Sequence, residues 1–355
     1  ALLPLIAAIQ KKDKTIVCII TTRTASAQKV FGTFGERSRV IVQLAPVDTP
    51  AAMQRFLDHW RPSAAIFCEA DIWPNAAMML KRRDIPIALV NAQMNGRFGG
   101  MFRKLPGIGR WLMSHVDYLH VFTAKDAAEA RNWVQSNCVI SVQPNLKMDA
   151  PALSVRPEVI QDIKEQFGTS PILTCVSVAN NEVKTLLESH RLMQVALPDL
   201  RLILVPRWIE QGAEIQKIVA QFGVSFSRRS IDGRPNQTDS VFIADTYREM
   251  GNWIEISFAV FMGHTLEGGS GHNPYEPVSQ QRMIISGSIP NLLQADYQYL
   301  TDLKLCTVSR TSDEIAESGL ELWKNRQHNK DIFSHFVRDQ GFTNNMLDEI
   351  LALLY

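Results

Sequence analysis

The sequence predicts an α/β protein with two Rossmann-like domains, each a doubly wound parallel sheet, that face a cleft. Three observations support this prediction. Short apolar runs alternate with helical patterns, which is typical of parallel sheets covered by helices on both faces. The runs form two successive series, and a length of 355 residues suits two domains. Polar residues and glycines follow the apolar runs directly, at the strand ends where doubly wound sheets bind ligands.

The expected strands fall into two series, and the interval between them marks the domain boundary. The first series comprises residues 15–21, 40–44, 64–69, 85–91 and 118–122. The second series comprises residues 172–176, 202–205, 241–244, 258–263, 283–286 and 306–308. We therefore expect a first domain over residues 1–148 and a second over residues 149–320. Residues 321–355 are expected to be C-terminal helices that pack back on the first domain.

The first residues read as the interior of a domain. Residues 1–9 have the pattern of an amphipathic helix without a capping residue, and they lead into the expected strand at 15–21. An α/β domain normally begins with a strand before such a helix. We therefore expect at least one strand to precede Ala1 in the whole protein.

The composition is that of an ordinary globular protein, with 46% hydrophobic and 21% charged residues. A net charge of +1 gives no general electrostatic attraction to nucleic acid, which we exclude as a partner. The five cysteines and eight histidines lack the spacing of a metal site, so no metal is expected. The sequence contains no apolar run of about 18 residues, the length that would cross a membrane.

The segment 263–277, GHTLEGGSGHNPYEP, follows an apolar run at 256–262. Its glycines predict a tight turn, and Pro274 suits a helix start because proline lacks the N–H that the first helical turn leaves unpaired. Such a turn presents free N–H groups to an anion. Glu276 is placed to accept hydrogen bonds from two sugar hydroxyls. Phosphate and ribose together describe a nucleotide; the alternative is a turn that only connects a strand to a helix.

Two carboxylates follow the expected strand at 64–69. Glu69 and Asp71 stand just before Trp73 and Pro74. Carboxylates at such a strand end serve acid/base catalysis or substrate positioning. The alternative is a helix-capping Asp71 beside a solvated Glu69.

Three further polar side chains stand at strand ends or at the domain junction. Lys147, at the junction, would hold a phosphate or carboxylate, or else be an ordinary surface lysine. Arg207 follows the strand at 202–205 and would grip an anion with two hydrogen bonds, or else form an inter-domain ion pair. Ser177 would cap a helix, donate to a phosphate, or do both.

The segment 94–113 combines basic and bulky apolar residues and contains no acidic residue. Its cations are Arg97, Arg103, Lys104 and Arg110. Such a mixture suits the surface of an anionic lipid layer, or a phosphorylated lipid substrate. The alternative is a helix with an apolar face in the core and a solvated basic face.

Six segments, in this order along the chain, resemble motifs of the 3-deoxy-D-manno-octulosonic acid (Kdo) transferases of lipopolysaccharide synthesis. The matching segments are 69–75, 91–97, 144–149, 205–208, 244–246 and 270–277. The last reads Ser-Gly-His-Asn-Pro-Tyr-Glu-Pro where the family has Gly-Gly-His-Asn-Pro-x-Glu-Pro. The resemblance extends over most of the 355 residues.

The resemblance implies an inverting glycosyltransferase of the GT-B type. It implies CMP-Kdo as donor, a lipid A precursor as acceptor, no cofactor or metal, and a place at the cytoplasmic face of the bacterial inner membrane, peripheral or anchored by an N-terminal segment. It implies that the family's general base precedes Ala1. The implied site residues are, for catalysis, Glu69, Lys147 and Arg207; for the donor, Ser177, Arg207, Asp245, Thr265, Gly271, His272, Asn273 and Glu276; and for the acceptor, Asp71, Asn91, Arg97, Arg103 and Lys104.

Several positions depart from the family pattern. Trp208 replaces a histidine, His264 and Arg248 replace glycines, and the family's Ser-Thr-His-x-Gly-Glu-Glu becomes residues 177–183, SVANNEV. Two alternatives therefore stay open. One is a GT-B transferase that uses a different sugar nucleotide, and the other is a degenerate homologue that binds lipid or nucleotide without turnover.

Overall fold

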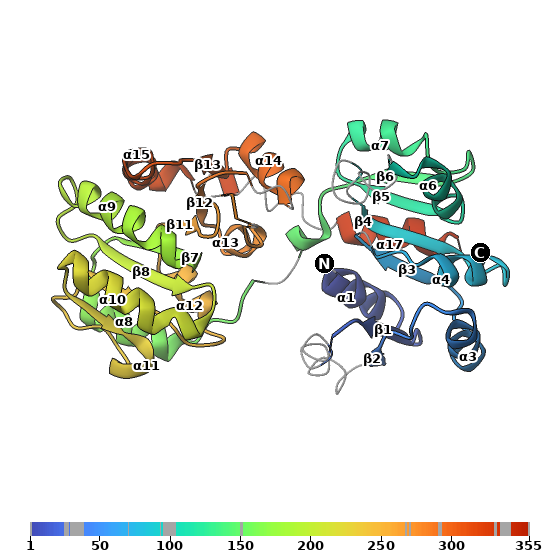
Figure 1. Ribbon diagram of the computed structural model, residues 1–355, viewed down its shortest axis with the longest axis horizontal. Coiled ribbons are helices and arrows are strands. Elements are labelled where there is room, and N and C mark those ends of the chain that lie inside the picture. Colours follow the sequence, from blue (N-terminus) through green and yellow to red (C-terminus); the bar gives the residue numbers. More distant parts are fainter. Residues whose placement is uncertain are drawn as a thin grey trace. The chain divides into compact units, whose positions relative to one another are not determined.

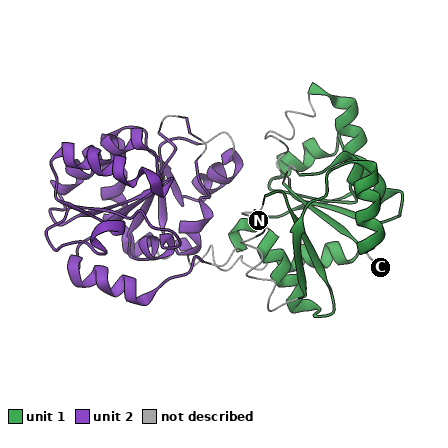
Figure 2. Ribbon diagram, turned by 60° about the horizontal axis from the view of Figure 1, so that its bottom comes forward, with its two compact units in different colours: residues 1–150, 340–355 green, residues 151–339 purple. Residues whose placement is uncertain are grey.

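A computed structural model of the protein describes residues 2–24, 28, 39–69, 71–92, 94, 104–149, 152–266, 268–269, 271–289, 293–329, 332–333 and 342–353. The chain forms two compact units, which Figure 2 shows in different colours. Unit 1 comprises Ala1–Ala150 with Gln340–Tyr355, and unit 2 comprises Pro151–Asp339.

Unit 1 consists of parallel strands with helices around them (Figure 1). Its strands are β1 (Cys18–Thr22), β2 (Val40–Leu44), β3 (Ala65–Cys68), β4 (Ile87–Ala92), β5 (Tyr118–Val121) and β6 (Val139–Val142). Its helices are α1 (Leu2–Lys12), α3 (Pro50–Trp60), α4 (Pro74–Lys81), α6 (Pro106–Met113), α7 (Ala124–Ala130), the 3-10 helix η1 (Leu146–Asp149) and α17 (Phe342–Leu351).

The strands of unit 1 form two sheets. Strand β1 pairs with β2, and the other four form a sheet in the order β3-β4-β5-β6. All of these pairings are parallel. Among the described residues no strand pairing joins the two sheets. The expected strand before Ala1 stays a prediction.

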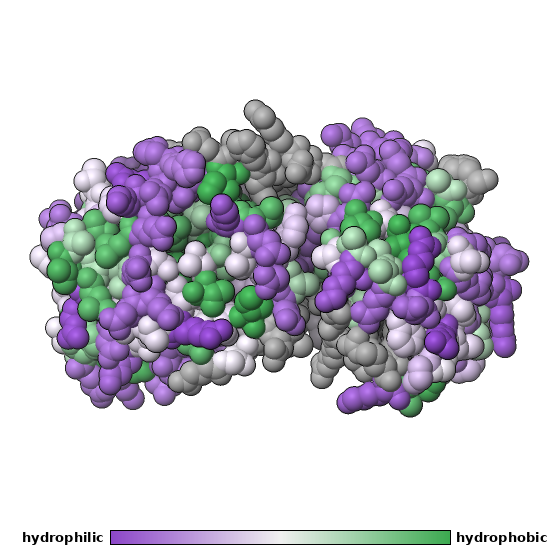
Figure 3. All heavy atoms as spheres, turned by 90° about the horizontal axis from the view of Figure 1, so that it is seen from above, coloured by the Kyte–Doolittle hydropathy of each residue, from purple (hydrophilic) through white to green (hydrophobic). Residues whose placement is uncertain are grey.

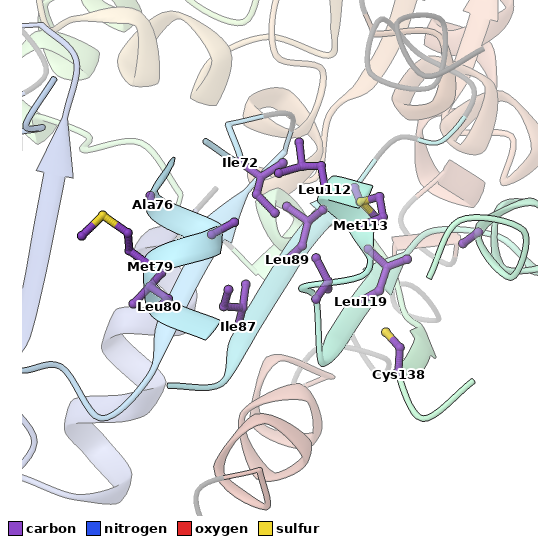
Figure 4. Packing of buried hydrophobic residues seen from close by; sticks show 14 of the residues in the cluster. Ile72, Ala76, Met79, Leu80, Ile87, Leu89, Leu112, Met113, Leu119 and Cys138 are labelled. Carbon is purple, nitrogen blue, oxygen red and sulfur yellow. The ribbon is translucent and has the colours of Figure 1, made fainter. Parts of the chain in front are cut away.

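The core of unit 1 lies between the four-stranded sheet and its helices. Strand β4 is buried along its whole length, and every residue in it except Asn91 is apolar. Figure 4 shows Leu89 of β4 and Leu119 of β5 close to Leu112 and Met113 of α6. Burying side chains of this size stabilises the fold by about 1.5–3 kcal/mol each.

Unit 2 is built around one larger parallel sheet. Its strands are β7 (Ile172–Val178), β8 (Arg201–Pro206), β9 (Phe226–Arg228), β10 (Val241–Ile243), β11 (Ala259–Met262), β12 (Met283–Ser286) and β13 (Cys306–Val308). Its helices are α8 (Pro157–Phe167), η2 (Asn180–Glu182), α9 (Val183–Gln194), η3 (Ile209–Gln211), α10 (Gly212–Phe222), α11 (Arg229–Asp232), α12 (Met250–Glu255), α13 (Tyr275–Ser279), α14 (Gln294–Asp302) and α15 (Ser312–Lys324).

The sheet of unit 2 has the order β13-β12-β11-β7-β8-β10-β9. Strand β7 has β8 on one side and β11 on the other, so the chain passes from one side of β7 to the other between β10 and β11. Doubly wound sheets bind ligands in the crevice outside the carboxyl ends of the strands at such a switch point. In this unit the switch point lies at the ends of β7 and β11.

The α/β class and the parallel sheets predicted from the sequence are confirmed. The eleven expected strands all form, with ends that move by up to three residues. Strands β6 and β9 were not predicted. Both are short and partly exposed, so neither has a continuous apolar run that the sequence pattern could reveal.

The chain changes units at Ala150–Pro151 and at Asp339–Gln340. The sequence predicts these changes at 148 and 320, and a change at 320 would cut through α15. Helix α15 belongs to unit 2 because Gly319 brings its backbone close to Met193 of α9. Helix α17 belongs to unit 1, where Thr343 donates its backbone N–H to Asp149 of η1 over 3.2 Å.

Each unit contains one buried histidine held in its neutral form. The Nδ1 atom of His120 accepts the backbone N–H of Asn91 over 3.0 Å, and Nε2 lies 3.0 Å from the carbonyl oxygen of Gln143. In unit 2, Nε2 of His190 lies 2.9 Å from the carbonyl oxygen of Leu200. Burial lowers the pKa of each imidazole from 6.5 to about 4.

These two pKa values predict that the fold begins to lose stability at a pH well above the usual pKa values of carboxyl groups. Between pH 6.5 and about 4 the unfolded chain binds protons that the folded chain excludes, so stability falls as pH falls through this window. From pH 7 to pH 5 we expect the free energy of unfolding to fall by about 2 kcal/mol for each histidine. Urea midpoints at the two pH values measure this change, and equal midpoints would contradict it.

Candidate functional site

Backbone strain marks the carboxyl ends of the strands. Glu69, Asn91, Ser177 and His264 all have positive φ angles, between 55° and 62°. They lie at or just beyond the ends of β3, β4, β7 and β11. Residues with a Cβ adopt this conformation at an energetic cost, and such residues cluster at functional sites. The strain therefore points to the same sheet edges as the strand order.

The buried carboxylate of Glu182 holds the turn that follows β11. Its two oxygens accept backbone N–H groups from His264, Thr265 and Leu266 over 2.6, 2.8 and 3.0 Å. They also accept the N–H of Ala179, over 3.0 Å. Hydrogen bonds to a charged acceptor are roughly twice as strong as neutral ones. This one side chain therefore joins the loop after β7 to the loop after β11, directly at the switch point.

A close approach of the two strand ends makes Gly263 necessary. A Cβ atom at this position would lie 2.6 Å from the carbonyl oxygen of Ser177. Ser177 lies inside β7, at a bulge against β8, and the first residue of η2 is Asn180. Ser177 therefore does not cap a helix, which corrects that prediction.

Three amides of the glycine turn are not available to an anion. The amides of residues 264–266 are already bound to Glu182, so they do not face a phosphate. The helix that follows, α13, has only five residues. An anion site at the N-terminus of α13 stays a prediction.

Four side chains lie in contact beside this turn. Nη1 of Arg207, directly after β8, donates to Nδ1 of His272 over 2.7 Å. Because a guanidinium only donates, Nδ1 carries a lone pair, and a neutral His272 has its proton on Nε2. Nε2 lies 3.5 Å from Oε2 of Glu276. Asn273 reaches the other oxygen of Glu276 over 3.4 Å. The sequence prediction grouped these four residues, and the structure brings them together.

Arg207 keeps most of its donors for a ligand. Among the described residues, its remaining N–H groups have no hydrogen-bond partner, and its guanidinium lies 5.5 Å from the centre of the Trp208 ring. Gly271 connects to the same loop through its N–H, which donates to the carbonyl oxygen of His264 over 3.0 Å.

Two predicted donor residues have internal partners instead. Asp245 is buried, bonded to Arg228 over 2.5 Å and to the hydroxyl of Ser230 over 2.8 Å. Thr265 donates its hydroxyl to the carbonyl oxygen of Met262 and accepts the N–H of Gly287. The polar atoms of both side chains are bonded to other residues of the protein. We therefore correct their assignment from ligand binding to support of the loops.

In unit 1 the ion pair of Lys147 and Glu69 lies at the carboxyl end of β3. Nζ of Lys147 is 3.0 Å from Oε1 of Glu69, and 48% of the Glu69 side chain is exposed. Lys147 is positioned by η1, whose first turn is held from β4: Asn91 donates to Asn145 and accepts the N–H of Leu146, both over 2.9 Å.

Asn91 is therefore a supporting residue. It is 1% exposed and both ends of its amide are bonded to the η1 segment. Its predicted role in acceptor binding is corrected for this reason. His120 extends the network by accepting the backbone N–H of the same residue.

Asp71 is exposed and pairs with Arg23 over 3.2 Å, and Arg23 lies over the Trp73 ring. Asp71 does not cap α4. Asp48 caps this helix from a distant loop, because its carboxylate oxygens accept the N–H groups of Asn75 and Ala76 over 3.1 and 2.9 Å. No local pattern identifies Asp48 as a cap, because it lies 26 residues before Pro74.

Of the three basic residues assigned to the acceptor, Lys104 is exposed just before α6. Arg97 and Arg103 lie outside the described residues. In the described part of the chain, no group of three His, Cys, Asp or Glu side chains could hold a metal ion. No helix among the described residues is long and apolar enough to cross a membrane.

The fold is that of the GT-B type. Over 99% of this chain and 91% of the other, the structure is similar to a putative UDP-N-acetylglucosamine 2-epimerase from Listeria monocytogenes, with a TM-score of 0.65 and 13% sequence identity. At this identity the likeness shows the fold alone.

The sequence is similar to one family of transferases. A family model described as 3-deoxy-D-manno-octulosonic-acid transferase (kdotransferase) matches residues 1–150. The chain is 26% identical to a 3-deoxy-D-manno-octulosonic acid transferase of Haemophilus influenzae over 92% of its own length and 77% of the relative's. It is 28% identical to a probable mitochondrial transferase of the same name from Arabidopsis thaliana, over 78% of its own length and 63% of the relative's. The chain is therefore similar to Kdo transferases over most of its length.

The contacts of Glu182 predict a coupled loss of stability and nucleotide binding. Replacing Glu182 with alanine leaves four backbone N–H groups without their acceptor, so we expect unfolding to become easier by about 3 kcal/mol. We also expect weaker nucleotide binding, because the loops after β7 and β11 are no longer joined. Urea denaturation and calorimetric titration measure the two effects. The exposed Glu210, replaced in the same way, is the control, and equal behaviour of the two variants would refute the assignment.

Proposed function

We propose that the protein is an inverting glycosyltransferase that moves Kdo from CMP-Kdo to a lipid A precursor. The proposal is based on the contacts of Arg207, His272 and Glu276 at the carboxyl edge of the larger sheet. These residues offer a partly free cation and a carboxylate at the ligand-binding edge of a doubly wound sheet, in a chain similar to Kdo transferases.

On the donor side, each group has a separate task. Glu276, with a quarter of its side chain exposed, accepts hydrogen bonds from the ribose hydroxyls. The free N–H groups of Arg207 donate to the phosphate of CMP. As the bond between the sugar and this phosphate breaks, negative charge grows on the leaving oxygen, and a fixed cation stabilises it. His272 orients both groups, because its two ring nitrogens face them.

On the acceptor side, the described residues contribute binding and orientation. Lys147 holds Glu69 at 3.0 Å and presents a cation beside a carboxylate at the strand end. A carboxylate here accepts a hydrogen bond from the acceptor hydroxyl, and the ammonium group attracts a phosphate of the lipid. Asp71 and Lys104 would extend this surface.

The exposed side of α6 suits the surface of an anionic membrane. Leu105, Ile108 and Trp111 are 54%, 54% and 43% exposed, and Lys104 and Arg110 are exposed beside them. The opposite side, with Leu112 and Met113, lies in the core. Large apolar side chains in solvent together with cations favour the interface of anionic lipids. We propose that this side contacts the inner membrane from the cytoplasm.

The protein's activity is tested by transfer from CMP-Kdo to a tetra-acylated lipid A precursor, read by mass spectrometry of the lipid. A product heavier by one or more Kdo units supports the proposal. Folded protein that binds a UDP-sugar but not CMP-Kdo would establish the alternative of a changed donor. Folded protein that binds neither nucleotide would refute both.

The donor assignment predicts a specific effect of Glu276→Gln. The amide keeps the size of the side chain but loses the charge that strengthens its hydrogen bonds to ribose, so we expect the Kd for CMP to rise about tenfold. Calorimetry measures this change. The exposed Glu210→Gln is the matched control, and an unchanged Kd in the Glu276 variant would remove the ribose assignment.

The membrane assignment predicts that replacing Ile108 and Trp111 together with serine abolishes most binding to anionic vesicles, because their burial in lipid drives the association. Co-sedimentation with vesicles containing phosphatidylglycerol measures this loss, which we expect to be at least tenfold. Val195→Ser, at an 85% exposed position in unit 2, is the control. Equal binding of the variant and the wild type would contradict the assignment.

A further inference from the structure

Two neighbouring loops at the carboxyl edge of the larger sheet expose aromatic rings. Trp208 follows β8 and is 60% exposed, and Tyr247 follows β10 and is 68% exposed. Strands β8 and β10 are adjacent. The two loops also touch, because a Cβ atom at Gly212 would collide with the carboxylate of Asp245. Both residues therefore lie on touching loops at the same end of the sheet, and Trp208 directly follows Arg207.

The polar groups of these side chains are unused. Among the described residues, the indole N–H of Trp208, the hydroxyl of Tyr247 and the guanidinium of Arg248 have no hydrogen-bond partner. Single exposed aromatic residues are common on protein surfaces, but two of them together with an unpaired cation on touching loops are not explained by the fold.

Local interactions fix the backbone at two of these residues, Trp208 and Arg248. The N–H of Trp208 donates to the Gln211 side chain over 3.3 Å, and the Gln211 N–H donates back to the Trp208 carbonyl over 2.9 Å. Arg248 has a φ angle of 61°, a conformation that glycine would adopt without cost. The next residue, Glu249, is buried and bonded to Arg229, which fixes this strained position.

We propose that Trp208, Tyr247 and Arg248, here called the aromatic rim, bind an anionic sugar ring. The apolar C–H face of a sugar stacks on the indole, and Arg248 donates hydrogen bonds to the carboxylate or phosphate that the sugar carries. The inference rests on the proposed function and adds a specificity-determining site to it. An acidic sugar of the donor and a phosphorylated sugar of the acceptor share this chemistry.

The sequence supports a role that is particular to this chain. Trp208 and Arg248 stand where the motifs it resembles have a histidine and a glycine. These two departures are separated by 40 positions in the sequence, yet both contribute to the aromatic rim. A substitution of glycine by a strained arginine adds a cation at a cost to the fold, which a binding role explains.

The test compares Trp208→Ala and Arg248→Gly with the wild type. The second variant removes the strain as well as the cation, so a loss of binding cannot come from a less stable fold. Val195→Ala and Arg234→Ala, at exposed positions elsewhere in unit 2, are the matched controls.

Calorimetry with CMP and CMP-Kdo, and the KM for the lipid acceptor with and without its phosphates, distinguish the two sources of the sugar. If the donor sugar binds, the Kd for CMP-Kdo rises about tenfold in both variants and that for CMP does not change. If the acceptor sugar binds, only the KM for the phosphorylated acceptor rises. Unchanged values for both substrates would overturn the proposal.

If the protein is not a Kdo transferase, the same experiments give a different result. In that case the wild type neither binds CMP-Kdo nor transfers Kdo, whatever the variants do. The aromatic rim is then tested directly by the quenching of tryptophan fluorescence with free Kdo. Quenching that is lost in Trp208→Phe supports the rim, and quenching that persists there, or is absent in the wild type, overturns it.

Discussion

The carboxylate of Glu182 is the interaction on which the edge of the larger sheet depends. It binds four backbone N–H groups from two loops that are more than 80 residues apart in the sequence. A buried carboxylate without these donors would be strongly destabilising, and the turn after β11 without the carboxylate would leave buried amides unpaired. Each part therefore requires the other, and the loop that carries His272 and Glu276 continues from this anchor.

In both units, buried polar residues fix the loops, and other polar residues remain exposed. In unit 2, Glu182, Asp245 and Thr265 are buried and fix loops, while Arg207, His272 and Glu276 remain partly exposed. In unit 1, Asn91 and Asn145 are buried and fix the helix that carries Lys147. Satisfied buried networks hold a single conformation, which lets the exposed groups keep a fixed geometry before a ligand arrives.

Much of the fold could be predicted because parallel strands buried on both faces leave mainly apolar runs, as in β4 and β7. Strand β6 could not be recognised this way, because only one of its four residues is buried. The part of the candidate site formed by Arg207, His272 and Glu276 was also predictable from the motifs. The same motifs could not tell that Asn91 and Asp245 face the interior.

Long-range partners explain the other omissions. Glu182 lies in a segment that departs from the family pattern, and its acceptor role depends on amides 82 to 84 residues away. Asp48 caps a helix that begins 26 residues later. Such contacts exist only once the strands have been ordered side by side. The reverse also holds: Trp208 and Arg248 read as isolated substitutions in the sequence, and only the adjacency of β8 and β10 places their loops together.

We infer that the carboxyl edge of the larger sheet is a site for CMP-linked sugars. Hydrogen–deuterium exchange of the full chain, measured with CMP, with UDP and without nucleotide, tests it most directly. We predict that CMP slows the exchange of backbone amides around Arg207 and across residues 271–276, and that UDP does so less at the same concentration. Protection confined to other segments, or equal protection by both nucleotides, would contradict the account.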